Sequence, residues 1–375
     1  MIDLAAARET FAASTDLTVG IEEEFALIDP VTLDLVPEFA RLRDAGLKDD
    51  VLAGSIAGEL ISSEIEIRSG RGVDLADALA RQVEARRRLF RLAEAHGVAL
   101  GSTGTHPLSD YREQHLIDTE HYRRVGEGLK YVAWRNNTFS VHVHVGVRGG
   151  DRAVRVCDRL RPILPTLLAI SANSPFVDRI DSGLHTARTQ IFTKSFPRCG
   201  VPDAFGSWQA WHDYVDTLIR TNSIVEFTQL WWSVRPHHDF GTVEVRICDA
   251  QTTAGESDAL VSLIVACVAQ ALREVDEGRP IPDLPARMIE ENMWRAIRYG
   301  LDGPLLDLEA ATVVEQPAVE AVERLSAWAG ASVDLPELNG AQRQRRMLDA
   351  GATPAEVYAE CVKETTATFQ EAVQK

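Results

Sequence analysis

The sequence predicts an α+β protein built on an antiparallel sheet with one polar face. Long segments with helical periodicity separate short segments that alternate apolar and polar residues with a period of two. The expected strands are 17–28, 59–67, 98–104, 138–147 and 241–248. Strands of a parallel sheet covered on both faces read instead as continuous apolar runs, so this alternation favours an antiparallel sheet over a doubly wound one.

Helix signals mark four segments between and around these strands. The expected helices cover 1–14, 74–97, 257–278 and the segment from 353 onward. The second of them has the clearest limits, because Asp74 is a good N-cap and Gly97 is a common C-terminal stop.

The composition is that of a globular protein with an acidic surface. Of the 375 residues, 45% are hydrophobic and 25% are charged, and the formal net charge is −17. Binding of nucleic acid needs clustered Lys and Arg, so we expect no nucleic-acid partner. No repeat or Pro/Gly/Ser-rich linker divides the chain. We therefore expect one domain over residues 1–375, with a helical C-terminal region at about 305–375.

The cysteine and hydropathy patterns predict a cytoplasmic protein. The five cysteines are scattered and none has CxxC spacing, which argues against a disulfide framework or a structural zinc site. No basic segment followed by an apolar one opens the chain, and stretches such as "ALVSLIVACVAQAL" are too short to span a bilayer. We therefore expect no membrane partner.

The first expected strand carries three consecutive glutamates, in "GIEEEF". Because neighbouring side chains on a strand point to opposite faces, Glu22 and Glu24 share one face. Glu23 lies on the other face, with Ile21 and Phe25. Two adjacent carboxylates repel each other unless a cation lies between them. We expect a cation at Glu22 and Glu24, and for Glu23 a local partner such as an arginine or a hydroxyl. Glu23 is then the glutamate whose replacement should leave the chemistry intact.

Three further strands repeat this arrangement of polar side chains at i and i+2 with valine or isoleucine behind them. The polar sets are Ser62, Glu64, Glu66 and Arg68; His142 and His144; and Glu244 and Arg246. Each set alone has a simpler explanation, a solvated face or an exposed ion pair that stabilises little. Their occurrence together, on strands suited to one sheet, favours a single polyvalent metal site.

The ligand chemistry of these sets favours Mg²⁺ or Mn²⁺. Carboxylates outnumber histidines and no cysteine joins them, whereas zinc sites are richer in His and Cys. A cupin-type iron or manganese centre would need a glutamate soon after "HVH", where the chain reads "VGVRGGDR". The arginine near Glu244 suits phosphate charge. The chain has no GxxxxGK[ST] loop, and the glycine-rich "GSTGTHP" at 101–107 reads by default as a tight turn.

Five segments, in order along the chain, resemble one known family: "GIEEEF", "STGTHP", "HVHVGV", "RPHHDFGTVEVRICD" and "YGLDGP". Together they are similar to the type-2 glutamate–cysteine ligases, also called carboxylate–amine ligases, which are related to glutamine synthetase. The resemblance runs from about Gly20 to about residue 300 and is looser beyond. It implies a glutamine-synthetase-like catalytic fold, in which a curved antiparallel sheet forms a partial barrel with helices packed outside. It also implies a homodimer.

The same resemblance implies roles for nine side chains. The implied metal ligands are Glu22, Glu24, Glu66, His142 and Glu244. His144 is expected to face the substrate, and Arg246 to steady the transferred phosphate. Arg235 and Arg188 are expected to contact substrate or phosphate. After the second glutamate strand the chain reads "RSGRG", where members of the family often carry small residues. We expect Arg68 or Arg71 to alter substrate recognition.

The implied reaction is ATP-dependent amide-bond formation with Mg²⁺ or Mn²⁺. A carboxylate substrate would take up the γ-phosphate of ATP, and an amine substrate would then attack the acyl phosphate. Two alternatives remain open: a guanidino-type kinase, which phosphorylates without ligating, and a non-catalytic nucleotide- or metal-binding protein on the same scaffold. The fold indicates the reaction class more securely than the substrates, and no residue identifies a pocket for cysteine.

Overall fold

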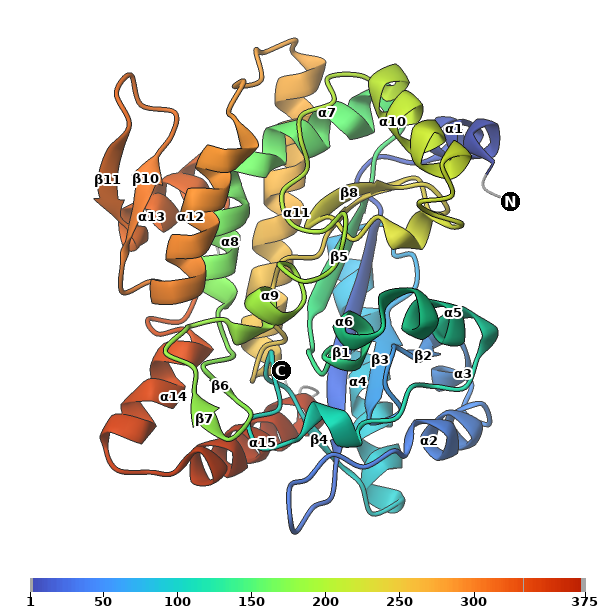
Figure 1. Cartoon of the computed structure of the whole chain (residues 1–375), viewed down its shortest axis with the longest axis vertical. Helices are drawn as coiled ribbons and strands as arrows, with labels where there is room; N and C mark the ends of the chain where they lie inside the picture. The colour runs from blue at the N-terminus through green and yellow to red at the C-terminus, as the bar shows by residue number, and fades with distance from the viewer. Residues whose placement is uncertain (1–2, 333, 372–375) are drawn as a thin grey trace.

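One seven-stranded antiparallel sheet organises the computed structural model, which describes residues 3–332 and 334–371 (Figure 1). Its strands run in the order β2-β3-β1-β5-β9-β8, and β4 pairs with the end of β1. Their bounds are β1 Val19–Ile28, β2 Ile56–Ala57, β3 Glu64–Arg68, β4 Ala99–Gly101, β5 Val141–Gly146, β8 Val234–His237 and β9 Thr242–Val245. The predicted α+β class with an antiparallel sheet is confirmed.

The expected strands are correct in position but too long, and two strands of this sheet, β2 and β8, were not predicted. β3 begins at Glu64 instead of at 59, because residues 60–62 form hydrogen bonds with residues 115–117 and not with β1. The segment expected to be a strand to residue 248 ends as β9 at Val245. β8 lacks a clear alternation and contains Pro236, which suits its place at the edge of the sheet.

Helices make up most of the remaining chain. The α-helices are α1 Leu4–Ala13, α2 Phe39–Gly46, α3 Leu52–Ser55, α4 Leu75–Ala95, α5 Glu120–Leu129, α6 Tyr131–Trp134, α7 Gly150–Leu160, α8 Leu164–Ser171, α9 Ala187–Ile191, α10 Trp208–Arg220, α11 Ala254–Asp276, α12 Ala286–Tyr299, α13 Ala318–Ala329, α14 Gly340–Asp349 and α15 Pro354–Glu371. Asp74 caps α4 as predicted, by accepting a hydrogen bond from the backbone of Asp77 at 2.9 Å. α11 begins earlier than expected, because Thr253 and Glu256 form a capping box. Residues 1–2 of the first expected helix and the end of the last one lie outside the described residues.

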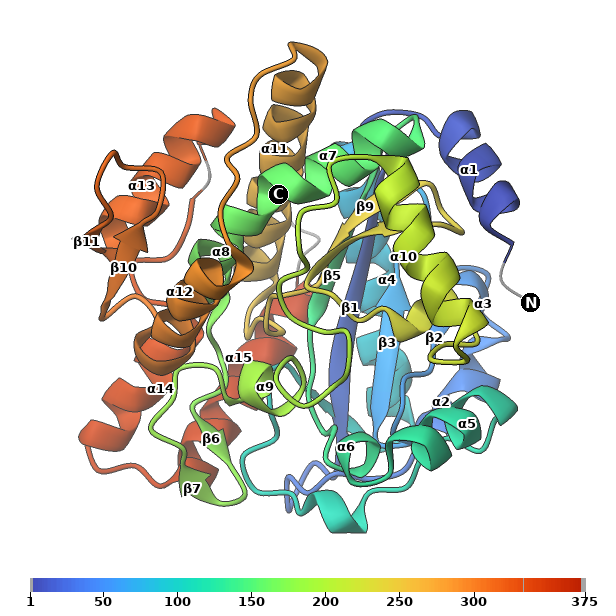
Figure 2. The ribbon, with the colours of Figure 1, turned by 45° about the horizontal axis from the view of Figure 1, so that its top comes forward.

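Apolar side chains on one face of the sheet pack against helices, and this packing fixes which face the alternating polar side chains occupy. Ile21, Val143 and Val245 belong to a core shared with α7 and α11, and Ile65 and Ile67 to a core shared with α4. Burial of each such side chain stabilises the fold by about 1.5–3 kcal/mol. The polar residues between them must therefore point to the opposite face, which α5 and α9 border (Figure 2).

Two small hairpins lie outside this sheet. β6 Phe176–Val177 pairs with β7 Ile180–Asp181, and β10 Pro304–Asp307 pairs with β11 Val314–Pro317. The C-terminal region thus contains the second hairpin in addition to α13, α14 and α15. Across residues 3–332 and 334–371, no helix combines the length and apolar character needed to cross a membrane.

Candidate active site

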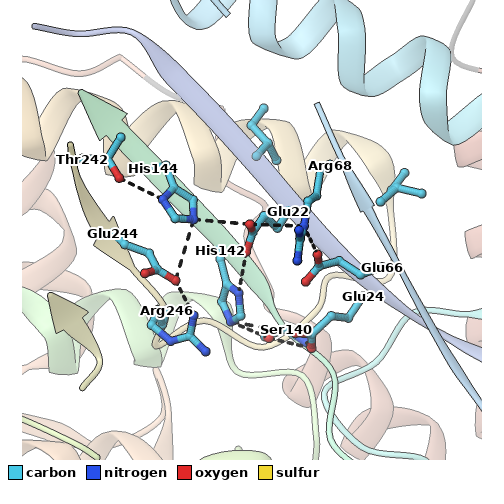
Figure 3. A network of polar contacts seen from close by, with 12 residues as sticks. Glu22, Glu24, Glu66, Arg68, Ser140, His142, His144, Thr242, Glu244 and Arg246 are labelled. Carbon is cyan, nitrogen blue, oxygen red and sulfur yellow. Dashed lines mark hydrogen bonds and ion pairs between the residues drawn. The ribbon is translucent and has the colours of Figure 1, made fainter. Parts of the chain in front are cut away.

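The register of the sheet brings the polar pairs of the strands together on the face away from the core helices (Figure 3). The cross-strand neighbours are Glu22 and Arg68, Glu24 and Glu66, Glu22 and His142, His144 and Glu244, and Arg235 and Glu244. Eight of the nine side chains to which the family resemblance assigns a role line one cavity of about 290 Å³. The ninth, Glu66, forms a compact group with Glu22 and His142 at its wall.

Three overlapping groups of side chains at this cavity could hold metal ions. They are Glu22, Glu66 and His142; Glu22, His144 and Glu244; and Glu24, Glu59 and Glu66. In each group, one ligand atom from every member lies within 4.8 Å of the others. Glu64 Oε2, Glu66 Oε2 and His144 Nε2 are buried without a hydrogen-bond partner among the described residues. Unpaired buried polar atoms are costly, and a bound cation would give these atoms a partner. Because most of the donors are carboxylate oxygens, the set fits hard divalent cations.

Glu22 lies between two histidines. His142 Nδ1 is 3.2 Å from Glu22 Oε2, and His144 Nε2 is 3.4 Å from Glu22 Oε1. Burial opposes ionisation, but the neighbouring His144, the hydrogen bond to His142 and the charge of Arg68 hold the pKa of Glu22 well below its usual 4.5. Burial and the charge of Arg246, the residue directly after β9, lower the pKa of His142 to about 4. His142 is therefore neutral near pH 7, the form that binds a metal ion.

Two arginines hold Glu244. Arg235 Nε donates to Glu244 Oε2 at 2.6 Å, and Arg246 Nη1 donates to Glu244 Oε1. Against the effect of burial, these two guanidinium groups hold the pKa of Glu244 well below its usual value. Arg235 also donates to the backbone oxygen of Leu230 at 2.5 Å, so its donors are largely committed within the protein. Arg246 Nε is buried at the cavity without a partner among the residues described.

Four further carboxylates gather beside these residues with less compensation from cations: Glu24, Glu59, Glu64 and Glu66, of which Glu66 is paired with Arg68. Burial raises the pKa of Glu24, and burial together with the Glu24 charge raises that of Glu59. Burial and the mutual repulsion of the group raise the pKa values of Glu64 and Glu66 well above 4.5. Ser140 supplies part of the stabilisation, because its backbone N–H and its hydroxyl donate to Glu24 Oε2 at 2.5 and 2.6 Å. Adjacent carboxylates of this kind ionise together only when a cation is bound.

Sequence reasoning missed Glu59. It lines the cavity from the irregular segment before β3, where a period of two carries no information about direction. Tyr122 on α5 and Trp231 before β8 also line the cavity and come from segments with no link to the strand pattern. The one available signal was the acidic character of "GELISSEIEI", which contains one glutamate in addition to Glu64 and Glu66.

Arg188 reaches the cavity from α9. Its side chain is 2% exposed and donates to the backbone oxygens of Ile247 at 2.9 Å and of Arg246 at 3.2 Å. Its Nε has no partner among the described residues. Arg188 and Arg246 therefore each retain one unpaired donor in a buried, cationic part of the cavity.

The glycine-rich "GSTG" segment supports this wall and does not form a phosphate loop. Asp249 is completely buried and accepts hydrogen bonds from Asn173 N at 2.9 Å, Ser174 Oγ at 2.6 Å and Thr186 Oγ1 at 2.9 Å. A Cβ atom at Gly104 would lie 2.6 Å from Asp249 Cγ. Glycine is therefore required for close approach to this carboxylate, which ties together the segments that lead into α9.

Glu23 faces away from the cavity, as predicted, and has the expected partners. Arg86 donates to both of its oxygens, at 2.5 and 2.6 Å, and both side chains are almost completely buried. Gln82 donates to Glu23 Oε2 at 2.8 Å, and Ser257 Oγ donates to Oε1. The expectation of an arginine or a hydroxyl is confirmed, and both are present.

Comparison with known sequences connects this site to one family. Residues 18–374 match the family described as "Glutamate-cysteine ligase family 2". A "Putative glutamate--cysteine ligase 2-2" of Rubrobacter xylanophilus is 42% identical over 320 residues, which cover 84% of this chain and 80% of that protein. A "Putative glutamate--cysteine ligase 2" of Solibacter usitatus is 35% identical over 366 residues, 93% of each chain.

Solved structures share the fold at low sequence identity. The glutamate–cysteine ligase of Francisella tularensis, solved in complex with AMP, superposes with a TM-score of 0.67 at 13% identity and covers 95% of this chain and 90% of that one. A bifunctional glutathione synthetase from Pasteurella multocida gives a TM-score of 0.68 at 13% identity over 98% of this chain, which spans only 54% of that enzyme. From the match over nearly its whole length and from these relatives, the chain belongs to the glutamate–cysteine ligase family 2.

Proposed function

We propose that this protein is an ATP-dependent carboxylate–amine ligase that forms an amide bond through an acyl phosphate. One observation carries the proposal: a cluster of buried carboxylates with raised pKa values lies at the same cavity as Arg188 and Arg246, whose Nε donors have no partner among the described residues. Family membership sets the reaction class, and glutamate with cysteine is the first substrate pair to test. We further propose that residues 1–375 act as one catalytic domain and that the enzyme is a homodimer.

The carboxylates at the cavity are suited to divalent cations. We assign Mg²⁺ or Mn²⁺ to the ligands Glu22, Glu24, Glu66, His142 and Glu244, with Glu59 added from its position in the third ligand group. When bound, such ions would supply charge screening for the triphosphate of ATP. Arg235 acts as a positioning residue in this scheme, because it orients Glu244 and has few donors left for a substrate.

Arg188 and Arg246 are suited to bind the transferred phosphoryl group. A substrate carboxylate oxygen attacks the γ-phosphorus of ATP, the bond to the bridging oxygen breaks, and ADP leaves. Arg246 and Arg188 can each direct an unpaired Nε–H at the charge that develops on the phosphoryl oxygens. His144, held by a contact of 3.0 Å with Thr242 Oγ1, faces the same space. The amine nitrogen then attacks the acyl carbon and phosphate departs.

A matrix of carboxylates and amines tests the proposal, with ADP release and product mass as separate readouts. Amide product formed together with ADP supports ligation. ADP with a phosphorylated product and no amide would indicate the guanidino-type kinase, whereas nucleotide binding without ADP release would indicate a non-catalytic protein. Glu24→Ala and Glu244→Ala should abolish ADP release while the circular dichroism spectrum is retained. A mass measurement in solution equal to twice that of the chain would support the homodimer.

A further inference from the structure

Arg68, the last residue of β3, contacts two of the proposed metal ligands (Figure 3). Its Nε donates to Glu66 Oε1 and lies 3.5 Å from Glu22 Oε1. Together with His142, these two glutamates form one of the three overlapping candidate ligand groups described above. The guanidinium of Arg68 therefore neutralises Glu22 and Glu66, the two carboxylates that a divalent ion bound by this ligand set would need.

A divalent ion and the guanidinium group compete for these carboxylates. Arginine does not lose its proton in proteins, so the conflict cannot be relieved by deprotonation. Like charges a few ångströms apart repel strongly in a partly buried site. Binding of a metal ion at Glu22 and Glu66 must therefore move the Arg68 side chain or be weakened by it.

The Arg68 side chain has the freedom to move. It is 43% exposed, whereas Glu22 is 13% and Glu66 is 1% exposed. Among the described residues it has no polar contact beyond these two carboxylates. The other arginines of the cavity are held in place, with side chains no more than 13% exposed: Arg188, Arg235 and Arg246.

We propose that Arg68 is a tethered cation that holds Glu22 and Glu66 in the metal-free protein, leaves them when a divalent ion binds, and then pairs with a non-reacting carboxylate of the substrate. Because Arg68 lines the cavity, its released guanidinium remains within reach of a bound anion. Metal ions and dicarboxylates would then bind cooperatively, since each stabilises the same displaced position of the side chain. Only the identification of this anion as a substrate rests on the proposed ligase function.

Binding of Mn²⁺ alone, followed by the EPR signal of the free ion without nucleotide, tests the first step. Arg68→Gln should bind Mn²⁺ about tenfold more tightly than the native protein, a difference of about 1.4 kcal/mol. Arg68→Lys keeps the charge and should stay within about twofold of the native affinity. Arg71→Gln is the matched control, because Arg71 is exposed and forms no ion pair within the described chain.

Glutarate, a dicarboxylate without an amine, tests the second step in the same assay. It should tighten Mn²⁺ binding by the native protein and by Arg71→Gln, and should lose this effect in Arg68→Gln. Unchanged or weaker Mn²⁺ binding by Arg68→Gln, or equal tightening by Arg68→Lys, would overturn the competition. Absence of a glutarate effect in the native protein would overturn the coupling.

Thermal melting confirms that each variant is folded, and Arg68→Ala provides a second uncharged variant. None of these measurements requires turnover. A protein that fails to ligate any substrate can therefore still support or refute the role of Arg68.

Discussion

Replacement of Glu23 by glutamine should destabilise the protein and leave its chemistry intact. Arg86 is completely buried, and the bidentate contact with Glu23 provides most of its charge compensation. Without that carboxylate, Arg86 keeps Asp258 at 2.7 Å as its anionic partner. Removal of one member of a buried ion pair costs about 3–5 kcal/mol, because the remaining charge stays desolvated.

The expected change in melting temperature follows from the size of the chain. Unfolding entropy is about 2.1 cal/mol/K per residue, or about 0.8 kcal/mol/K for 375 residues. A loss of about 4 kcal/mol then lowers Tm by about 5 °C if the chain unfolds as one unit. Arg86 depresses the pKa of Glu23 against the effect of burial. The stabilisation is therefore fully present above pH 4.5 and is lost as the pH falls through the folded-state value.

Glu24→Gln is the matched control, because it makes the same change one residue further along β1 on the opposite face. Burial raises the pKa of Glu24, so loss of its charge should leave Tm unchanged or raise it. Turnover, in contrast, should be lost. Calorimetry and an ADP-release assay at a temperature where both variants are folded separate these effects. The reasoning is refuted if Glu23→Gln loses turnover while folded, or if Glu24→Gln has the larger drop in Tm.

Three further predictions concern the same cavity and its support. Gly104→Ala should lower stability by about 1–3 kcal/mol, since its Cβ would overlap Asp249, and an unchanged melting curve would contradict this packing. Glu59→Gln should weaken Mn²⁺ binding by about 10–100-fold in a direct titration; an unaltered affinity would remove Glu59 from the site. Glu64 and Glu66 have raised pKa values, so their contribution to the stability of the metal-free protein is fully present below pH 4.5 and is lost as the pH rises through the folded-state values. Mg²⁺ should therefore raise Tm more at about pH 8 than at about pH 5.5, and the opposite order would argue against a cation at this cluster.

The strand pattern alone predicted which side chains share a face. Alternation along an extended chain is a local property of the backbone, so the sequence was sufficient to pair Glu22 with Glu24 and His142 with His144. The need for a partner at Glu23 followed equally from the cost of burying a charge. Strand ends were less predictable, because they depend on the segment with which each strand pairs, as residues 60–62 demonstrate.

The tertiary structure decided which charges meet. Ser257, a partner of Glu23, lies 234 residues away in the chain, and no local pattern connects the two. The sequence contained no indication that Arg235 is committed to Glu244 or that Arg68 also contacts Glu22, and only the acidic character of the segment before β3 pointed to Glu59. The distance between charged groups and the loss of their hydration determine which charges pair and how far their pKa values shift. These distances and this loss of hydration are set only when distant segments of the chain pack together.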